Sequence, residues 1–285
     1  MEKLRWSLRK TEVQLLRLLQ GNRLTLTELA SELSKSMPTV SEAVKHLELL
    51  GMVEKERKGT KVTVAMPKTP LGESLSLLMA EQPMLNLETL FSGSGLVMLP
   101  LLLKPGYSAK ELAERTSLSL RTVKGLLPRW KRMGVVLQEQ SNYQLNPRFT
   151  LLANFLGKFN EHKNLCIMKD NYPEGVIVWQ WRDEFFFSID AKLNDPNALP
   201  AGLTRLDELK SGLAHGQQYY YYGRADKAIS EEEAFMQALY VDPYNPRIKN
   251  LISKRLGDLD SEAFFNYAGK YAKKNAIKDL VRKWP

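Results

Sequence analysis

A repeated stretch of the chain runs, in its first copy, Thr25-Leu-Thr-Glu-Leu-Ala-Ser-Glu-Leu-Ser-Lys-Ser-Met-Pro-Thr-Val-Ser-Glu-Ala-Val-Lys-His-Leu-Glu-Leu-Leu-Gly-Met-Val53. The second copy begins 83 residues later and needs no gap: Ser108-Ala-Lys-Glu-Leu-Ala-Glu-Arg-Thr-Ser-Leu-Ser-Leu-Arg-Thr-Val-Lys-Gly-Leu-Leu-Pro-Arg-Trp-Lys-Arg-Met-Gly-Val-Val136. Two copies are too few for a solenoid, so the repeat predicts two homologous small domains.

Both copies predict the same pair of helices. Thr25-x-x-Glu28 and Ser108-x-x-Glu111 are capping boxes, which begin a short helix by pairing a hydroxyl and a carboxylate with backbone N–H groups. After a tight turn, a serine caps a longer helix in each copy. In the first copy the longer helix follows Ser36 and has a buried stripe at helical spacing, made of Val40, Ala43, Val44, Leu47 and Leu50.

A glycine and an alternating strand pair follow each longer helix. Gly51 and Gly134 stand where a helix end favours a left-handed residue. Residues 52–65 and 135–145 then alternate apolar and polar side chains about a turn, which predicts a β-hairpin in each copy. A further helix is predicted at residues 11–20, before the first copy.

With these elements the first copy strongly resembles the MarR/ArsR-like winged helix-turn-helix regulators of bacteria and archaea. The resemblance rests on four segments: Thr27-Glu-Leu-Ala, Ser36-x-Pro-Thr-Val-Ser, Leu47-Glu-x-x-Gly-x-Val and the basic hairpin Glu54-Lys-Glu-Arg-Lys-Gly-Thr-Lys61. It covers residues 8–66 well, residues 88–148 less completely, and nothing of residues 150–285.

The resemblance implies that the longer helix of the first copy enters the major groove of DNA. The buried stripe leaves six candidate contact residues facing outward: Ser36, Pro38, Thr39, Ser41, Glu42 and Lys45. Four basic hairpin residues are expected to contact the minor groove or the phosphate backbone: Lys55, Arg57, Lys58 and Lys61. Glu42 is unfavourable beside phosphate, so it either accepts from a cytosine amino group or faces away.

The second copy carries more positive charge on its longer helix. Its candidate DNA contacts are Arg121, Thr122 and Lys124, and further charge comes from Arg129, Lys131 and Arg132. Pro128 removes a backbone hydrogen bond and is expected to kink or end this helix. Because the second hairpin lacks basic residues, this copy is either a second DNA contact or a packing or dimerisation domain.

The net charge of +9 is concentrated in the first half of the chain. Residues 1–70 carry +5, residues 71–148 carry +3 and residues 149–285 carry only +1. Local positive charge of this kind is typical of nucleic-acid binding, although a slightly basic soluble protein would show it too.

Four segments are expected along the chain: a first winged helix at 1–68, a linker helix at 69–87, a second winged helix at 88–148 and a C-terminal domain at 149–285. The fold class is therefore α+β, with two tandem winged helix-turn-helix domains followed by a mixed α+β domain that carries an aromatic β-hairpin. The C-terminal domain is expected to sense a small-molecule or protein effector. Its aromatic residues either stack on a planar effector or a base, or pack a core or a domain interface: Trp179, Trp181, Tyr219, Tyr220, Tyr221 and Tyr222.

Other chemistry finds little support. The single cysteine, Cys166, and three scattered histidines predict no disulfide and no zinc site, which suits a reducing cytoplasm. No cofactor, membrane span or signal peptide is expected. Asp183, Asp190 and Lys192 mimic the layout of a metal-dependent nuclease, but chance is the better account of so short a pattern.

The sequence thus predicts a cytoplasmic DNA-binding transcriptional regulator with no catalytic activity. A homodimer is expected, because two recognition helices read a longer site than one. The alternatives are a winged-helix protein-interaction module or an antitoxin-type autoregulator that binds a protein partner.

Overall fold

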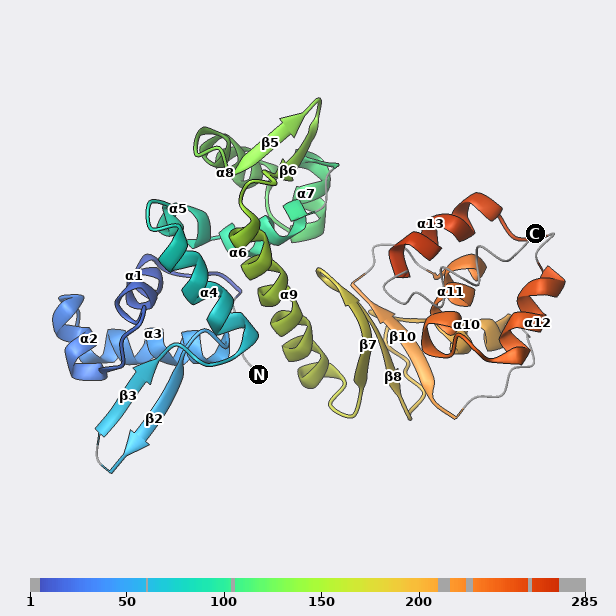
Figure 1. Cartoon of the computed structure of the whole chain (residues 1–285), viewed down its shortest axis with the longest axis horizontal. Coiled ribbons are helices and arrows are strands. Elements are labelled where there is room, and N and C mark those ends of the chain that lie inside the picture. Colours follow the sequence, from blue (N-terminus) through green and yellow to red (C-terminus); the bar gives the residue numbers. More distant parts are fainter. Residues whose placement is uncertain are drawn as a thin grey trace. The chain divides into compact units, whose positions relative to one another are not determined.

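The computed structural model describes residues 6–59, 61–103, 106–209, 216–223, 228–255 and 258–271. This part of the chain has a mixed α+β fold with three small antiparallel sheets (Figure 1). Among the described helices, none has the length and apolar character that crossing a membrane requires.

The first winged helix, defined here as residues 10–65, has the element order that the sequence predicts. Its elements are α1 (Lys10–Leu18), β1 (Leu24–Thr25), α2 (Leu26–Glu32), α3 (Met37–Leu49), β2 (Glu54–Lys58) and β3 (Lys61–Ala65). The strands form a sheet in the order β1-β3-β2. Three helices with such a sheet and hairpin form a winged helix-turn-helix.

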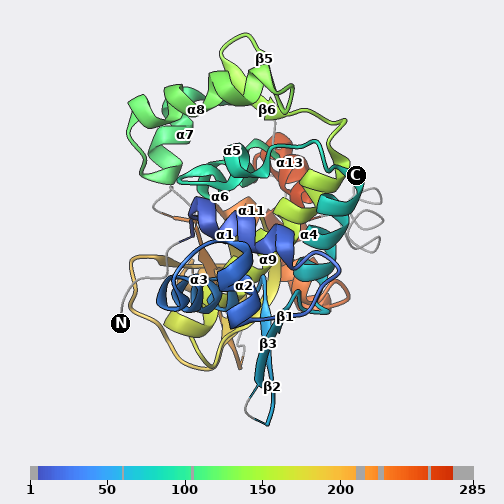
Figure 2. The same ribbon diagram turned by 90° about the vertical axis from the view of Figure 1, so that its left-hand side faces the viewer.

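The second winged helix, defined here as residues 95–145, repeats this architecture. It consists of α6 (Gly95–Met98), the 3-10 helix η1 (Leu99–Leu103), β4 (Tyr107–Ser108), α7 (Ala109–Thr116), α8 (Leu120–Arg132), β5 (Val136–Glu139) and β6 (Asn142–Leu145). The strand order β4-β6-β5 matches that of the first sheet. Figures 1 and 2 both show the two hairpins extending in opposite directions.

Both predicted capping boxes are confirmed at atomic detail. The backbone N–H of Thr25 donates to Glu28 Oε2 at 2.7 Å, and the N–H of Glu28 donates back to Thr25 Oγ1 at 3.2 Å. The corresponding distances between Ser108 and Glu111 are 2.7 and 3.3 Å. The two short helices therefore begin in the same way.

The turns also repeat. Gly51 and Gly134 end the longer helices with φ of 68° and 70°, as predicted. The turn before each longer helix contains a serine with positive φ, 51° at Ser34 and 54° at Ser117. A positive φ is uncommon for serine, so no residue pattern predicts it at these two positions. Its recurrence shows that both helix-turn-helix units use the same tight backbone turn.

Pro128 is expected to kink or end the second longer helix; α8 does not end there but continues through it to Arg132. Pro128 lies on the exposed side of α8, while Val123, Leu127 and Trp130 are buried on the other side. Packing of that apolar face offsets the loss of the hydrogen bond that Pro128 cannot donate. The carbonyl group left without this donor is on the exposed side of α8, where water can bind to it.

Two helices connect the winged helices: the first lies in the segment 69–87 where a linker helix is predicted, and the second lies mostly in the segment 88–148 that the sequence assigns to the second winged helix. They are α4 (Pro70–Glu81) and α5 (Leu87–Phe91). A close approach fixes the entry into α6, since a Cβ on Gly95 would lie 1.7 Å from the carbonyl oxygen of Leu90. Only glycine fits there, so the glycine at residue 95 is required by the path of the chain into α6.

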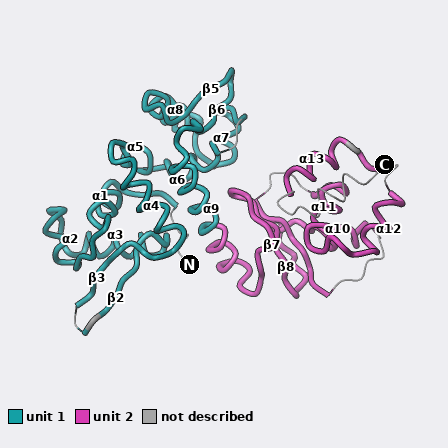
Figure 3. The backbone as a smooth tube through the Cα atoms, in the orientation of Figure 1, with its two compact units in different colours: residues 1–163 teal, residues 164–285 magenta. Residues whose placement is uncertain are grey.

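The sequence predicts a helix at residues 149–159, directly after Pro147. Helix α9 (Thr150–Asn171) lies there and continues for a further 12 residues. The chain divides into two compact units, Met1–Lys163 (unit 1) and Asn164–Pro285 (unit 2), so the division falls within α9 (Figure 3). The sequence boundary at residue 149 is earlier, because it follows the end of the repeat, whereas the first half of α9 packs into unit 1.

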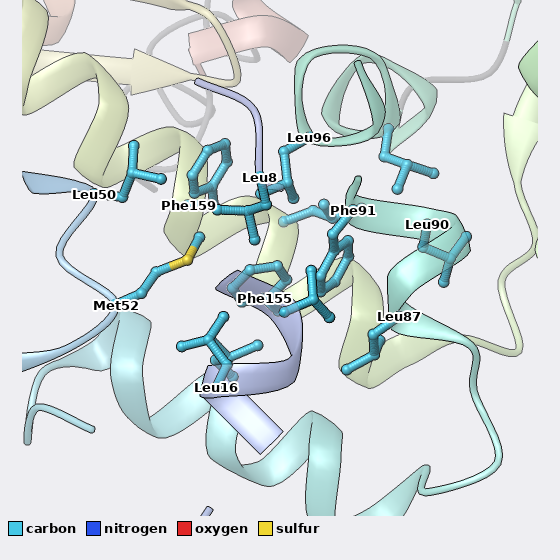
Figure 4. Close-up of a cluster of buried hydrophobic side chains, with 14 of the residues drawn as sticks. Leu8, Leu16, Leu50, Met52, Leu87, Leu90, Phe91, Leu96, Phe155 and Phe159 are labelled. Carbon is cyan, nitrogen blue, oxygen red and sulfur yellow. The ribbon is translucent and has the colours of Figure 1, made fainter. Parts of the chain in front are cut away.

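One hydrophobic core serves both winged helices. Figure 4 shows Leu8, Leu16, Leu50 and Met52 from the N-terminal region packed with α5, α6 and α9. Aromatic side chains complete the cluster, as they contact one another in the pairs Trp6–Phe159, Phe91–Phe155 and Phe155–Phe159. The same buried cluster includes Val123, Leu127 and Trp130 of α8.

Unit 2 is built on a four-stranded antiparallel sheet in the order β7-β8-β10-β9. Its strands are β7 (Val176–Trp181), β8 (Glu184–Ile189), β9 (Ala198–Pro200) and β10 (Gln218–Tyr222). Its further helices are α10 (Gly202–Glu208), α11 (Glu231–Val241), α12 (Pro246–Arg255) and α13 (Ser261–Tyr271). The predicted aromatic hairpin is thus confirmed as β7–β8. The sequence also predicts a short last helix at residues 277–282, which lie outside the described residues.

Candidate nucleic-acid interface

Helix α3 has one buried face and one exposed face. The predicted stripe of Val40, Ala43, Val44, Leu47 and Leu50 is buried in the core. The six candidate contact residues are all exposed: Ser36, Pro38, Thr39, Ser41, Glu42 and Lys45. Helical periodicity alone therefore placed these side chains on the solvent face.

Hydroxyl pairs mark the start of both longer helices. Ser36 Oγ lies 2.9 Å from Thr39 Oγ1, and Ser119 Oγ lies 2.8 Å from Thr122 Oγ1. Each serine also accepts from the backbone N–H of its threonine partner. Because a hydroxyl offers one donor and two acceptor sites, each pair retains hydrogen-bonding capacity for a phosphate or a base edge.

Glu42 lies on the exposed face of α3 and pairs with a residue that sequence reasoning missed. Arg9 Nη1 lies 2.9 Å from Glu42 Oε1, and both side chains are exposed. Arg9 precedes α1 and is 33 residues away in the chain, so no local pattern connects the two. The ion pair reduces the negative potential that Glu42 would otherwise place beside a bound phosphate.

The hairpin β2–β3 carries two predicted contact residues with accessible charge. Arg57 and Lys61 are exposed, and within the described residues neither forms an ion pair. The Arg57 Nε group donates to the carbonyl of Gly59 at 3.1 Å, which holds the guanidinium beside the turn. Lys58 pairs with Lys61 in the strand register, but its side chain lies outside the described residues.

A second ion pair stiffens the hairpin. Arg23, which precedes β1, pairs with Glu56 of β2. Sequence reasoning missed Arg23 because the pairing of β1 with β3 brings distant residues together. The pair neutralises a hairpin carboxylate, so it raises the net positive potential of the exposed surface.

In the second winged helix, the cations lie on α8. The predicted residues Arg121, Thr122 and Lys124 are exposed, as are Arg129, Lys131 and Arg132. No ion pair joins these basic side chains to a carboxylate in the part of the chain that the structure describes. Gly125 is also exposed, and a Cβ added there would meet no atom within 4 Å. A cationic, unobstructed helix face favours close approach of a polyanion.

One contact between helix and hairpin recurs with altered charge. Lys55 Nζ lies 2.6 Å from Glu48 Oε2, so this predicted contact residue is held by α3. At the equivalent positions, Lys131 Nζ donates to Gln138 Oε1 at 2.6 Å. The acidic residue is on the helix in the first copy, whereas a basic residue occupies that place in the second.

Most of the aromatic residues predicted either to stack on an effector or to pack a core lie in the interior of unit 2, as core packing requires. Trp179, Tyr219, Tyr220 and Tyr221 are buried. Trp181 is exposed, and the Arg182 guanidinium lies 4.9 Å from its ring centre. A planar effector therefore has no open platform on the four buried rings.

Lys270 of α13 occupies the space between several of these rings. Its Nζ lies 4.9 Å from the ring centre of Tyr221 and 5.5 Å from those of Trp179 and Tyr271. It also donates to the buried carboxylate of Glu233 at 3.0 Å. Cation–π contacts thus hold α13 against the sheet, and the charge-assisted hydrogen bond joins it to α11.

A strand separates the residues of the nuclease pattern. Asp183 lies in the turn before β8, and Asp190 follows the end of β8. Six residues of extended strand place the two carboxylates roughly 20 Å apart, too far to share a metal ion. The described residues contain no group of three or more His, Cys, Asp or Glu side chains that would hold a metal.

A comparison with known families bears on the first winged helix alone. Residues 7–69 match the sequence profile of a protein family described as HVO_A0114. The match spans α1 to β3, and its description names neither a ligand nor an activity. No curated protein matches the chain.

Proposed function

We propose that the protein is a cytoplasmic DNA-binding transcriptional regulator. Its winged helices bind duplex DNA, and unit 2 senses a small molecule or a protein partner. The observation that carries the proposal is the exposed positive charge on the two elements with which winged helices approach DNA: the hairpin β2–β3 and the helix α8.

Electrostatics supports this proposal. Residues 1–148 carry a net charge of +8, and the exposed carboxylates near α3 are offset by Arg9 and Lys55. Replacing counterions around phosphate with such side chains gives an affinity that falls steeply as salt rises. The homodimer on a palindromic site that the sequence predicts is the alternative to one chain on an asymmetric site, and the stoichiometry on selected duplexes distinguishes the two.

A second candidate function is protein binding by the second winged helix. Leu120 at the start of α8 and Leu137 on β5 are both exposed. Exposed leucines are typical of protein interfaces when they form a patch. A protein partner that copurifies with the chain, together with absence of duplex binding, would favour this candidate.

The test is to titrate the full chain into a labelled duplex between 50 and 200 mM salt. We expect the affinity to fall by orders of magnitude over that range. The triple variant Arg57→Glu, Lys58→Glu and Lys61→Glu should bind about 100-fold more weakly at fixed salt, because each reversal replaces attraction to phosphate by repulsion.

The matched control makes the same charge change elsewhere, at Lys68→Glu, Arg148→Glu and Lys192→Glu, which are all exposed. Its affinity should stay within a few-fold of the parent protein. Equal losses in both variants would contradict a role for the hairpin. Absence of any salt-dependent duplex binding would contradict the proposed function itself.

A further inference from the structure

We propose that a single chain carries two unlike DNA-reading surfaces on one core and recognises an asymmetric duplex with two different half-sites. This inference rests on the proposed function. The first surface is made by α3 with the hairpin β2–β3, and the second is made by α8. One chain would then supply two DNA-reading surfaces, whereas single winged helices supply two only when two chains form a homodimer.

Helix α5 forms polar contacts with both winged helices. Lys10 Nζ of α1 lies 3.3 Å from a carboxylate oxygen of Glu88, and Gln14 Nε2 donates to the same carboxylate at 3.2 Å. From the second winged helix, the Trp130 Nε1–H donates to the carbonyl of Thr89 at 3.4 Å. Glu88 and Thr89 are adjacent in α5, so this short helix joins the two copies.

Backbone hydrogen bonding also joins the segment before α1 directly to the segment before α6. Leu8, which precedes α1, forms a bridge with Ser92, and its carbonyl accepts from Gly93 N–H at 2.9 Å. Ser92 and Gly93 lead directly into α6, the first helix of the second winged helix. Backbone hydrogen bonds and a common core therefore connect the copies, so the distance between α3 and α8 is set by the fold.

The two copies lie at opposite ends of unit 1. Figures 1 and 2 show α2 and α3 at one end, α7 and α8 at the other, and α5 and α6 between them. The two hairpins extend away from each other in both views. A helix-turn-helix at each end, each with its own wing, gives one chain two separate places at which a duplex can be contacted.

The two surfaces differ in the side chains that they expose and in where their basic residues lie. Helix α3 offers hydroxyls and one lysine, Lys45, while its cations lie on the hairpin. Helix α8 contains five basic residues and no acidic one, and its hairpin carries a single charge, Glu139. Unlike surfaces read unlike half-sites, so the preferred duplex should lack two-fold symmetry.

The experiment selects bound fragments from a random duplex library with the full chain and then measures stoichiometry by native mass spectrometry. We expect two different half-sites at one fixed spacing, with one chain bound per duplex. An inverted repeat of one half-site with two chains per duplex would overturn the inference and leave DNA binding standing. Absence of any enriched duplex would instead overturn the proposed function.

Matched variants then assign each half-site to a surface. Arg121→Glu with Lys124→Glu should weaken binding to the selected duplex about 100-fold, and should cause little further loss once the second half-site is scrambled. Arg57→Glu with Lys61→Glu should show the same behaviour toward the first half-site. The control Lys68→Glu with Arg148→Glu makes an equal charge change and should spare both half-sites.

Spacing provides the last readout. Inserting five base pairs between the half-sites rotates one by about half a turn of B-DNA. Because the fold fixes the separation of α3 and α8, the insertion should cost about as much affinity as scrambling a half-site. Unchanged binding after insertion, or loss of both half-site preferences in each charge variant, would overturn the two-surface assignment.

Discussion

In the first winged helix the hairpin carries the positive charge and α3 is close to neutral; in the second, α8 carries five basic residues and the hairpin carries none. The backbones nevertheless agree in element order, sheet topology, capping boxes and turn dihedral angles. One fold can thus place its cations either on the hairpin or on the longer helix.

The recurring contact between helix and hairpin shows how the difference is accommodated. Glu48 and Lys55 in the first copy correspond to Lys131 and Gln138 in the second, and each pair is joined at 2.6 Å. The geometry is preserved while the helix residue changes from acidic to basic. Surface charge is therefore free to vary on a fixed scaffold, because exposed pairs of this kind contribute little to stability.

The largest expected effect concerns the core that both copies share. Trp130 of α8 and its counterpart Leu47 of α3 are both fully buried. We expect Trp130→Ala to lower the free energy of unfolding by about 3–5 kcal/mol and Leu47→Ala by about 2–5 kcal/mol. Urea denaturation of the full chain measures both.

Hydrogen exchange sharpens this prediction. If one core stabilises both winged helices, Trp130→Ala should reduce amide protection in α3 as well as in α8. Protection of α3 that stays at the parent level would show that the copies unfold independently. That result would also weaken the case for a fixed separation between the two recognition helices.

Sequence reasoning succeeded where the physical cause is local. Capping boxes, helical stripes and hairpin alternation depend on residues a few positions apart, and the elements of both copies lie where these patterns placed them. Exposure of the candidate contact residues on α3 followed from the same periodicity.

Sequence reasoning failed where partners are distant in the chain. The Arg9–Glu42 pair, the Arg23–Glu56 pair and the contact of Lys270 with Tyr221 each depend on the tertiary fold. The end of unit 1 was missed for the same reason, since α9 continues past the repeat and contributes Phe155 to its core. Pro128 misled because packing on one face outweighs the loss of one hydrogen bond.

A smaller effect tests the charge difference at one position. Glu42 of α3 corresponds to Gly125 of α8, so Glu42→Gln makes the first surface more like the second. We expect duplex affinity to rise about three- to tenfold, because a carboxylate is removed and Arg9 is released toward phosphate. Fluorescence anisotropy at fixed salt measures the change.

The matched control is Glu32→Gln, which removes an exposed carboxylate from α2. It should change affinity less than Glu42→Gln. A fall in affinity with lost preference at a single cytosine would contradict the repulsion argument. It would show instead that Glu42 accepts a hydrogen bond from a base.

The smallest effect tests the feature in which the copies agree most closely. Thr25→Ala and Ser108→Ala each remove the hydroxyl of a capping box and should each lower the free energy of unfolding by about 1 kcal/mol. Because the hydrogen-bond distances match within 0.1 Å, the two losses should be equal. Urea denaturation at neutral pH provides the comparison.

The pH dependence of stability gives the same comparison a second readout. Hydrogen bonds from the Thr25 backbone and hydroxyl lower the pKa of Glu28 below its ordinary value of 4.5, and Ser108 does the same for Glu111. A lowered pKa stabilises the fold above the ordinary value, and this contribution is lost as pH falls through the folded pKa. Glu28→Gln and Glu111→Gln should therefore each make stability less sensitive to pH below 4.5, by similar amounts. If only one variant changes the pH dependence of stability below pH 4.5, the two capping boxes differ in solution although their hydrogen-bond geometries agree.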